Sequence, residues 1–439
     1  MKELVSRIYE IIKKEHKADD YEVYISFSDN HEARFAQNAM SQHMTGQIVK
    51  VVYKASIDRK TASSSVNQYD EDTIRHLVKT TEDLARISQE DPEYIDSMGK
   101  QDYPKTDNIK SATMNLTPEM IVDIIKDAVD FAKSKGTKLS GIFSLNKTSF
   151  YFYTKRGFQG SYDTCSYEFS MTMKEGERET KVSTAGKDFS KFSLQSQLDQ
   201  LYSQFSSLDK PNAMEPETIS VILRPQAVAN IMMYLRWLLD RRMADDGITP
   251  LKGQIGKQFF GEKFNMSTVE KDDNMTIVPF SNDSVLKQID WIKDGVLKAQ
   301  PISRTYANMI DEKPSSMFNV LIEGDTTSEE DMMKMAGRGL IINNFWYIRT
   351  NDMRTFDLTG MTRDGVLYFE NGKVKHSVNN FRFNEKLHEI TRRIMALGES
   401  TIVFNSSVVP TMLIKDFHFI DRTNFWSIEQ LFFAFCKRN

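Results

Sequence analysis

Cysteine is scarce in this chain of 439 residues, which contains only Cys165 and Cys436. The two lie far apart in the sequence, so they do not form the closely spaced pattern of a disulfide-stabilised secreted protein. Their scarcity favours a reducing compartment. The first residues, MKELVSRIYEIIKKEHK, are charged throughout and lack the apolar stretch of a signal peptide. We therefore expect a cytoplasmic protein.

Long hydrophobic runs and a surplus of one charge are also missing. No stretch approaches the roughly 18 consecutive apolar residues of a membrane-spanning helix, so no membrane span is expected. With 57 basic and 61 acidic residues, the formal net charge is −4. This balance gives no general electrostatic reason to bind nucleic acid or an anionic membrane. Either partner would need a local basic patch.

The motifs of common enzyme classes are absent as well. None of the seven histidines lies at metal-ligand spacing from another on a helix, and no H-E-x-x-H or Cys/His cluster occurs. There is no G-x-S-x-G elbow, no P-loop and no G-x-G-x-x-G after a strand. Gly337-Arg338-Gly339 follows a predicted helix, which favours a C-terminal cap over a phosphate loop. The residues alone therefore indicate no active site.

The first half of the chain alternates between helical and strand periodicities. Predicted helices cover residues 2–16, 71–87, 117–136 and 194–205. Predicted strands cover residues 21–27, 33–36, 47–55, 61–65, 142–145, 149–153, 162–173 and 180–184. The order helix, strands, helix occurs twice, which suggests an internal duplication. We expect an N-terminal α/β unit with an antiparallel or mixed sheet flanked by helices.

A Pro-containing polar segment at residues 206–219 predicts a domain boundary, with one domain over 1–210 and another over 211–439. Strands dominate the second part and are predicted at residues 219–223, 275–279, 318–322, 340–348, 355–361, 401–404 and 411–420. Its predicted helices are 225–240, 328–335, 385–397 and 428–435, with a short helical piece near 254–259. Without regular helical crossovers, the pattern favours an α+β fold with a β-rich C-terminal domain over a doubly wound sheet.

One hairpin stands out at residues 363–384. Its arms, 366–369 and 374–383, are joined by Asn371-Gly372, which suits a type I′ turn. Polar residues interrupt the second arm where a core strand would alternate apolar and polar side chains. Two interpretations remain open, namely an edge strand with a solvated face and a functional surface.

The sequence around this hairpin resembles a known family. Residues 337–384, GRGLIINNFWYIRTNDMRTFDLTGMTRDGVLYFENGKVKHSVNNFRFN, are similar to the C-terminal signature of the TldD/PmbA (TldE) proteins, the "modulator of DNA gyrase" and peptide-maturation family. Residues 20–93 resemble the N-terminal domain of that family, and residues 245–260, DDGITPLKGQIGKQFF, resemble the loop after its central helix. The resemblance therefore covers most of the chain.

The resemblance implies a two-domain cytosolic protein that works as a dimer, in which TldD and PmbA/TldE form a zinc-dependent protease for unfolded or leader peptides. TldD proteins bind the metal through H-E-x-x-x-H on the central helix and a later cysteine. Here those helix positions fall at about Met233, Tyr234 and Leu238, and no cysteine lies between residues 371 and 435. This chain thus resembles the PmbA/TldE branch without the zinc motif. Zinc is expected only in a TldD-like partner, with no cofactor in this chain.

A non-catalytic subunit of this kind is expected to pair with a TldD-like partner or with a second copy of itself. It would hold an extended peptide against strand edges and polar side chains. The candidate peptide-binding residues are Arg363, Asp364, Asn379, Asn380 and Arg382. These residues could instead serve only hairpin solubility and turn geometry. The alternative function is a metallopeptidase in its own right with an unrecognised metal site.

Overall fold

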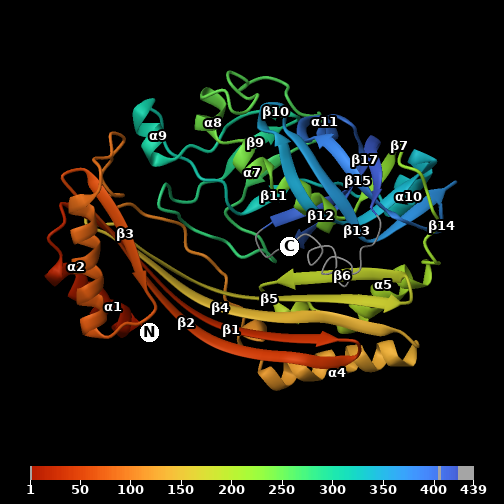
Figure 1. Ribbon diagram of the computed structural model, residues 1–439, viewed down its shortest axis with the longest axis horizontal. Coiled ribbons are helices and arrows are strands. Elements are labelled where there is room, and N and C mark those ends of the chain that lie inside the picture. Colours follow the sequence, from red (N-terminus) through yellow and green to blue (C-terminus); the bar gives the residue numbers. More distant parts are fainter. Residues whose placement is uncertain (1, 404–406, 424–439) are drawn as a thin grey trace, which may run out of the picture.

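The first half of the chain forms one antiparallel sheet in the computed structural model, which describes residues 2–403 and 407–423 (Figure 1). Its strands are β1 (Asp20–Ala36), β2 (Ala39–Ile57), β3 (Lys60–Val66), β4 (Lys138–Thr154), β5 (Gln159–Glu175) and β6 (Arg178–Gly186). They lie in the order β3-β2-β1-β4-β5-β6, so β1 and β4 pair at the centre.

The strands of this sheet are longer than the sequence predicts. The separate strands expected at 21–27 and 33–36 are both part of β1, and those at 142–145 and 149–153 are both part of β4. Asn30 lies opposite Gly46 on one side and Asn146 on the other. Because hydrogen bonds from two neighbours hold this polar stretch extended, it does not turn. The chain turns only at Gln37 and Asn38, where φ is 51° and 67°.

Four longer helices accompany this sheet. They are α1 (Lys2–Glu15), α2 (Glu71–Ile87), α4 (Pro118–Ser134) and α5 (Leu194–Ser206), with the short α3 (Ser111–Met114) and η1 (Phe189–Lys191) between them. Asp70 caps α2 and Thr117 caps α4, each through a side-chain oxygen that accepts a backbone hydrogen bond. The order α1β1β2β3α2 recurs as α4β4β5β6α5, so the predicted repetition of element order is present. In Figure 1, α1 and α2 lie at one end of the sheet and α4 beneath the other.

The second half of the chain forms an 11-stranded mixed sheet in the order β10-β9-β8-β11-β17-β15-β13-β12-β7, with β14 on β13 and β16 on β17. Its strands are β7 (Thr218–Leu223), β8 (Met266–Thr268), β9 (Ile289–Lys293), β10 (Val296–Leu297), β11 (Val320–Ile322), β12 (Arg338–Asp352), β13 (Asp357–Glu370), β14 (Lys373–Val378), β15 (Asn380–Lys386), β16 (Ile394–Val403) and β17 (Ser407–Thr423). The pairs β7–β12 and β11–β17 are parallel. The predicted α+β class is confirmed.

The helices of this half are short. They are α6 (Pro225–Met232), α7 (Leu235–Leu238), α8 (Arg241–Asp245), α9 (Arg304–Met309), α10 (Glu329–Ala336) and α11 (Leu387–Arg392), with η2 (Met353–Thr355). The single helix predicted at 225–240 is interrupted after Met232, where the amide of Tyr234 bonds to the carbonyl of Ile231, only three residues back. None of these helices, nor any other in the described ranges, is long and apolar enough to cross a membrane.

Some predicted elements of this half were wrong. The helix expected at 385–397 ends at Arg392, because residues from Ile394 onward pair with β17 as strand β16. Residues 275–279 form no named strand, and residues 254–259 form turns rather than a helix. The helix predicted at 428–435, and the end of the strand predicted at 401–404, lie outside the described residues.

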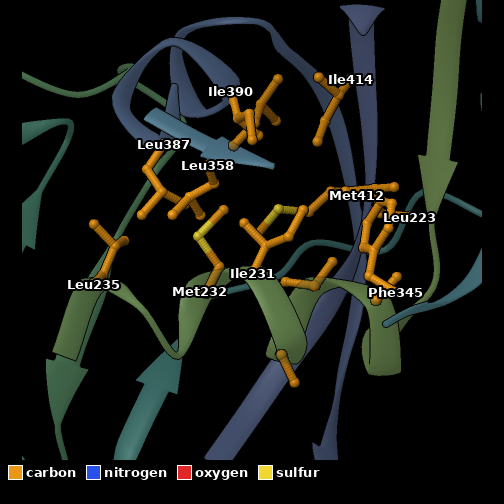
Figure 2. Close-up of a cluster of buried hydrophobic side chains, with 14 of the residues drawn as sticks. Leu223, Ile231, Met232, Leu235, Phe345, Leu358, Leu387, Ile390, Met412 and Ile414 are labelled. Atoms are coloured by element: carbon orange, nitrogen blue, oxygen red, sulfur yellow. The ribbon is translucent and has the colours of Figure 1, made fainter. Parts of the chain in front are cut away.

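Both faces of the second sheet are covered near β7. Leu223 packs with α6 and α11 in the core of Figure 2, together with Ile231, Leu387 and Met412. Its neighbour Ile222 points to the opposite face and joins a core that also contains side chains of β5, β6 and α5. The two sheets therefore meet over a shared apolar layer.

Candidate functional site

The predicted hairpin is confirmed, and its second arm divides in an unexpected place. Asn371 and Gly372 have φ of 53° and 72°, as a type I′ turn requires. The returning chain breaks at Asn379 into β14 and β15. Strand β14 pairs with residues 366–370 of β13, whereas β15 pairs with residues 357–361. Residues 362–365 of β13 therefore lie at a gap in this backbone pairing.

Polar side chains bridge this gap. The hydroxyl of Thr362 donates to the Asn380 side-chain carbonyl at 3.0 Å and accepts from the amide of Phe381 at 2.9 Å. Next to it, Asp364 and Gly365 have φ of 61° and 91°. An irregularity of this kind re-aims side chains, and such irregularities are common beside functional sites.

Asn343 connects the gap to the first sheet. It lies at a register shift between β12 and β13. Its amide nitrogen donates to the carbonyl oxygen of Asp364 at 2.9 Å and to the hydroxyl of Thr180 on β6 at 3.2 Å. Its side-chain oxygen accepts a hydrogen bond at 2.6 Å from Arg224, the residue immediately before α6. One buried amide thus fixes three separate segments.

The carboxylate of Asp364 is buried and is held by a second amide. Asn344 donates to it at 2.7 Å, and Asn230 on α6 donates in turn to the side-chain oxygen of Asn344 at 2.5 Å. The Nε of Arg363 lies 3.6 Å from the carboxylate. We call this group of side chains the polar seam, and its members are Asn343, Asn344, Thr362, Asp364, Asn379 and Asn380.

A cavity of about 400 Å³ opens beside the polar seam, between β6 and α5 on one side and the start of α6 on the other. The seam contributes Asn343, Asn344 and Asp364 to its wall. Helix α5 contributes Gln197, Gln200 and Gln204, whose spacing places them on one helix face. Side-chain amides both donate and accept hydrogen bonds, so this wall matches the hydrogen-bonding pattern of peptide groups.

Two of the four charged residues that line the cavity, Arg224 and Glu329, are paired with each other. Arg224 donates two hydrogen bonds to the carboxylate of Glu329, at 2.8 and 2.7 Å. Glu329 is the first residue of α10. The preceding residue, Ser328, is the N-cap of this helix and accepts a hydrogen bond from the amide of Asp331. The other two charged lining residues, Lys181 and Asp364, have opposite signs, so the wall of the cavity is polar and close to neutral.

The structure separates the five predicted binding residues into three groups. Asp364 lines the cavity. The side-chain oxygens of Asn379 and Asn380 accept hydrogen bonds from the amide of Met214 and the hydroxyl of Thr362, respectively. Arg363 and Arg382 are exposed and do not line the cavity. The guanidinium of Arg363 lies 4.6 Å from the ring centre of Trp346, which is half exposed.

Sequence reasoning missed the residues that complete the cavity. Arg224 could have been noticed because it directly precedes Pro225, the first residue of a helix. Glu329 lies in an acidic capping sequence at the start of α10. The three glutamines of α5 follow helical spacing, but nothing in that pattern indicates what faces them.

The positions that correspond to zinc ligands in TldD proteins do not fit a metal. Met233 is 43% exposed and lines an apolar pocket, Tyr234 donates its hydroxyl to the carbonyl of Ile348 at 2.7 Å, and Leu238 is buried in the core. Thioether and leucine side chains are not zinc ligands in proteins. In the part of the chain that the structure describes, no cluster of three or more His, Cys, Asp or Glu side chains could hold a metal ion.

Comparison with known proteins finds a family match over the region that contains the hairpin. Residues 216–421 match the family model described as the PmbA/TldA metallopeptidase C-terminal domain. This region is similar to the C-terminal domain of the PmbA/TldD family. The TldD/PmbA resemblance predicted from the sequence is thereby confirmed. No curated protein sequence matches the chain.

Solved structures extend the likeness of this chain to its whole fold. TldE from Thermococcus kodakarensis superposes with a TM-score of 0.85 at 14% identity, covering 95% of this chain and 99% of that one. A candidate modulator of DNA gyrase from Thermotoga maritima gives 0.82 at 14%, covering 95% and 100%. Another, from Bacteroides thetaiotaomicron, gives 0.82 at 13%, covering 96% and 98%. At these identities the likeness shows a shared fold.

Proposed function

We propose that this chain is a non-catalytic, TldE-like subunit of a TldD/TldE-type metallopeptidase system. It would pair with a TldD-like partner that carries the zinc, or with a second copy of itself. The observation that carries the proposal is the replacement of the zinc-ligand positions by Met233, Tyr234 and Leu238. Met233 lines an apolar pocket, the Tyr234 hydroxyl bonds to the carbonyl of Ile348, and Leu238 is buried. A reducing cytoplasm suits the free thiol of Cys165, whose pKa burial raises to about 11.

The cavity beside the polar seam is the proposed peptide site. Its glutamine and asparagine side chains can bond the N–H and C=O groups of an extended peptide whatever its sequence. Asp364 adds one anionic acceptor. This combination suits unfolded segments or leader peptides, in which backbone groups are free.

Metal analysis and a cleavage assay test the proposed division of roles. The purified chain is expected to hold no stoichiometric zinc and to cleave neither casein nor a leader peptide by itself. Adding a TldD-like partner is expected to produce cleavage. Stoichiometric zinc with cleavage by the chain alone would instead establish the alternative, a metallopeptidase in its own right.

A pair of matched variants on α5 tests the peptide site. Gln200 lines the cavity, whereas Gln195, on the same helix, does not and bonds to Asp199. Gln200→Ala is expected to weaken peptide binding by about three- to tenfold, as the loss of one hydrogen bond predicts. Gln195→Ala is expected to leave binding unchanged. Equal effects in a fluorescence anisotropy titration would place the peptide elsewhere.

A further inference from the structure

An apolar pocket lies at the other end of α6 from the polar cavity. It has a volume of about 180 Å³. The apolar residues that line it include Ala229, Met232, Met233, Met266, Val320 and Val409. A cavity of roughly 150 Å³ with aliphatic walls accommodates a benzene molecule. The pocket therefore has room for one aliphatic or aromatic side chain, and a long lipid tail is too large.

Arg236 lines the same pocket and differs from most other partly buried arginines. Arg224, Arg241 and Arg393 each form an ion pair with a carboxylate. Within the described ranges, no carboxylate lies at ion-pair distance from Arg236, and its guanidinium donates to the carbonyl of Met317 at 3.2 Å. Burial lowers the pKa of Arg236.

A partly buried cation without a counter-ion is unfavourable, since it has lost water and gained no opposite charge. A ligand that brings a carboxylate to Arg236 would gain a charge-assisted hydrogen bond at a site already partly dehydrated. The same ligand must place an apolar group in the adjoining pocket. In a peptide, the last residue carries both groups on a single α-carbon.

We propose that this pocket binds the C-terminal residue of a peptide, with its apolar side chain inside and its free carboxylate on Arg236. The inference rests on the proposed peptide-binding function, to which it adds a preference for one end of the peptide. Helix α6 has eight residues and spans about 12 Å. The pocket and the polar cavity are therefore a few extended residues apart.

The test uses fluorescein-labelled hexapeptides and the purified full-length chain without a partner. One peptide ends in leucine with a free carboxylate, a second is its C-terminal amide, and a third ends in serine with a free carboxylate. The leucine acid is expected to bind at least about tenfold more tightly than either control, because each control lacks one of the two contacts. Equal binding of acid and amide would overturn the proposal.

Variants of Arg236 then assign the carboxylate contact. Arg236→Gln is expected to remove the difference between acid and amide, whereas Arg236→Lys keeps part of it. Arg354→Gln, at an exposed arginine outside the pocket, makes the same charge change and is expected to keep the full difference. Circular dichroism spectra confirm that each variant is folded. An acid preference that survives in Arg236→Gln would contradict the assignment.

Competition with decanoate separates a peptide terminus from a free fatty acid, which has the same two chemical groups. Displacement of the leucine peptide by decanoate at equal or lower concentration would overturn the peptide assignment. The readout is independent of cleavage. Zinc-dependent cleavage by the chain alone would refute the non-catalytic role but not the preference for a free C-terminal carboxylate. Absence of that preference would refute only the proposal that the pocket binds a peptide C-terminus.

Discussion

The side-chain carbonyl of Asn379 accepts a hydrogen bond from the backbone N–H of Met214 at 2.7 Å, across 165 residues of sequence. The segment predicted as a domain boundary is thus fastened along the hairpin. The amide of Asn212 bonds to the carbonyl of Ser377 at 2.9 Å, and the hydroxyl of Ser377 donates to the carbonyl of Asp209 at 2.6 Å. Asn379 therefore has a structural task that its place in the hairpin sequence does not reveal.

Replacing Asn379 tests this connection. Asn379→Leu is expected to lower the free energy of unfolding by about 1–3 kcal/mol, because the amide of Met214 loses its acceptor. Asn379→Asp keeps a carbonyl oxygen in place and is expected to be milder. Urea unfolding followed by circular dichroism measures both. An unchanged midpoint for the leucine variant would show that water replaces the lost acceptor.

Arg224 and Glu329 provide a second test, at the wall of the cavity. Their side chains are 16% and 33% exposed. Arg224→Met is expected to destabilise the protein by about 2–4 kcal/mol, because it leaves the Glu329 carboxylate and the Asn343 oxygen without their donor. The double variant Arg224→Met/Glu329→Leu is expected to lose less than the sum of the single variants. Strict additivity in the double-mutant cycle would contradict a direct coupling.

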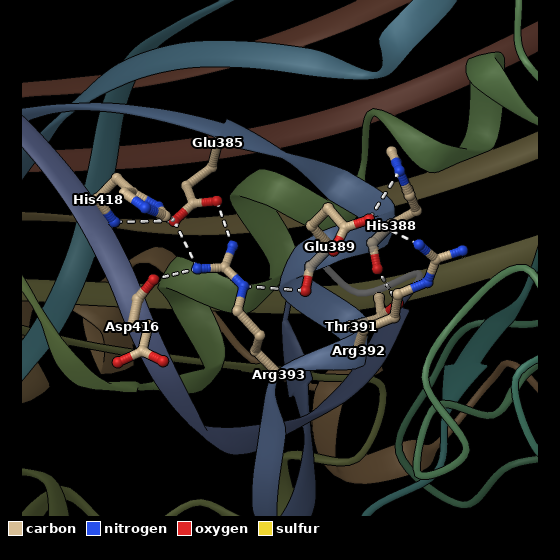
Figure 3. A network of polar contacts seen from close by, with 8 residues as sticks. All are labelled: Glu385, His388, Glu389, Thr391, Arg392, Arg393, Asp416 and His418. Atoms are coloured by element: carbon tan, nitrogen blue, oxygen red, sulfur yellow. Dashed lines mark hydrogen bonds and ion pairs between the residues drawn. The ribbon is translucent and has the colours of Figure 1, made fainter.

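The buried carboxylate of Glu385 is the centre of the network in Figure 3. It accepts two hydrogen bonds from Arg393 and two from His418, one from its amide and one from its ring. Glu385→Gln is expected to cost about 2–4 kcal/mol, because Arg393 loses its counter-ion in a largely buried place. Lys79→Met, at an exposed ion pair with Asp83, is expected to leave the unfolding midpoint unchanged. Similar losses in the two variants would rule out a special role for burial.

His388 makes stability depend on pH. Burial lowers its pKa from 6.5 to about 4, and its ring packs 5.1 Å from the ring centre of Phe259. Between these two values the unfolded chain binds a proton that the folded chain excludes, so stability falls as the pH drops from about 6.5 to 4. The loss at pH 4 amounts to up to about 3 kcal/mol. Unfolding free energies at pH 7 and pH 4.5 measure it.

The matched variant for this pH effect is His388→Phe, which keeps an aromatic ring beside Phe259. It is expected to show a smaller decrease in stability between pH 7 and pH 4.5 than the parent protein. The pKa of His16 is also lowered by burial, so part of the decrease remains in the variant. Identical decreases in the two proteins would show that His388 is not the responsible group.

Local sequence signals predicted turns and helix ends correctly where no distant segment competes for the same backbone. Asn371-Gly372 formed the expected turn, and Thr117 with Pro118 began the expected helix. They failed where tertiary pairing was stronger. Residues 394–397 have a helical pattern, yet they lie in β16 because β17 is beside them. The turn-prone Asp29-Asn30 stays extended for the same reason.

The candidate site was harder to predict than the fold. The interrupted hairpin drew attention to Asp364, which lines the cavity. The other wall comes from Gln197, Gln200 and Gln204, more than 150 residues away in the sequence. No local pattern in the sequence indicates that α5 and β13 line the same cavity. Likewise, the solitary charge of Arg236 becomes visible only when its neighbours in space are known.

Strand β6 has a neighbour strand on one side only, β5, and so ends the first sheet. Its other flank lies against the second sheet, where Thr180 meets Asn343 and the carbonyl of Glu179 approaches Gly365. A fragment that stops after residue 210 would retain every strand of the first sheet and expose this edge of β6 to solvent. An uncovered strand edge recruits other chains. Residues 1–210 produced alone should therefore self-associate, which makes the C-terminal half a solubilising cover for the N-terminal half.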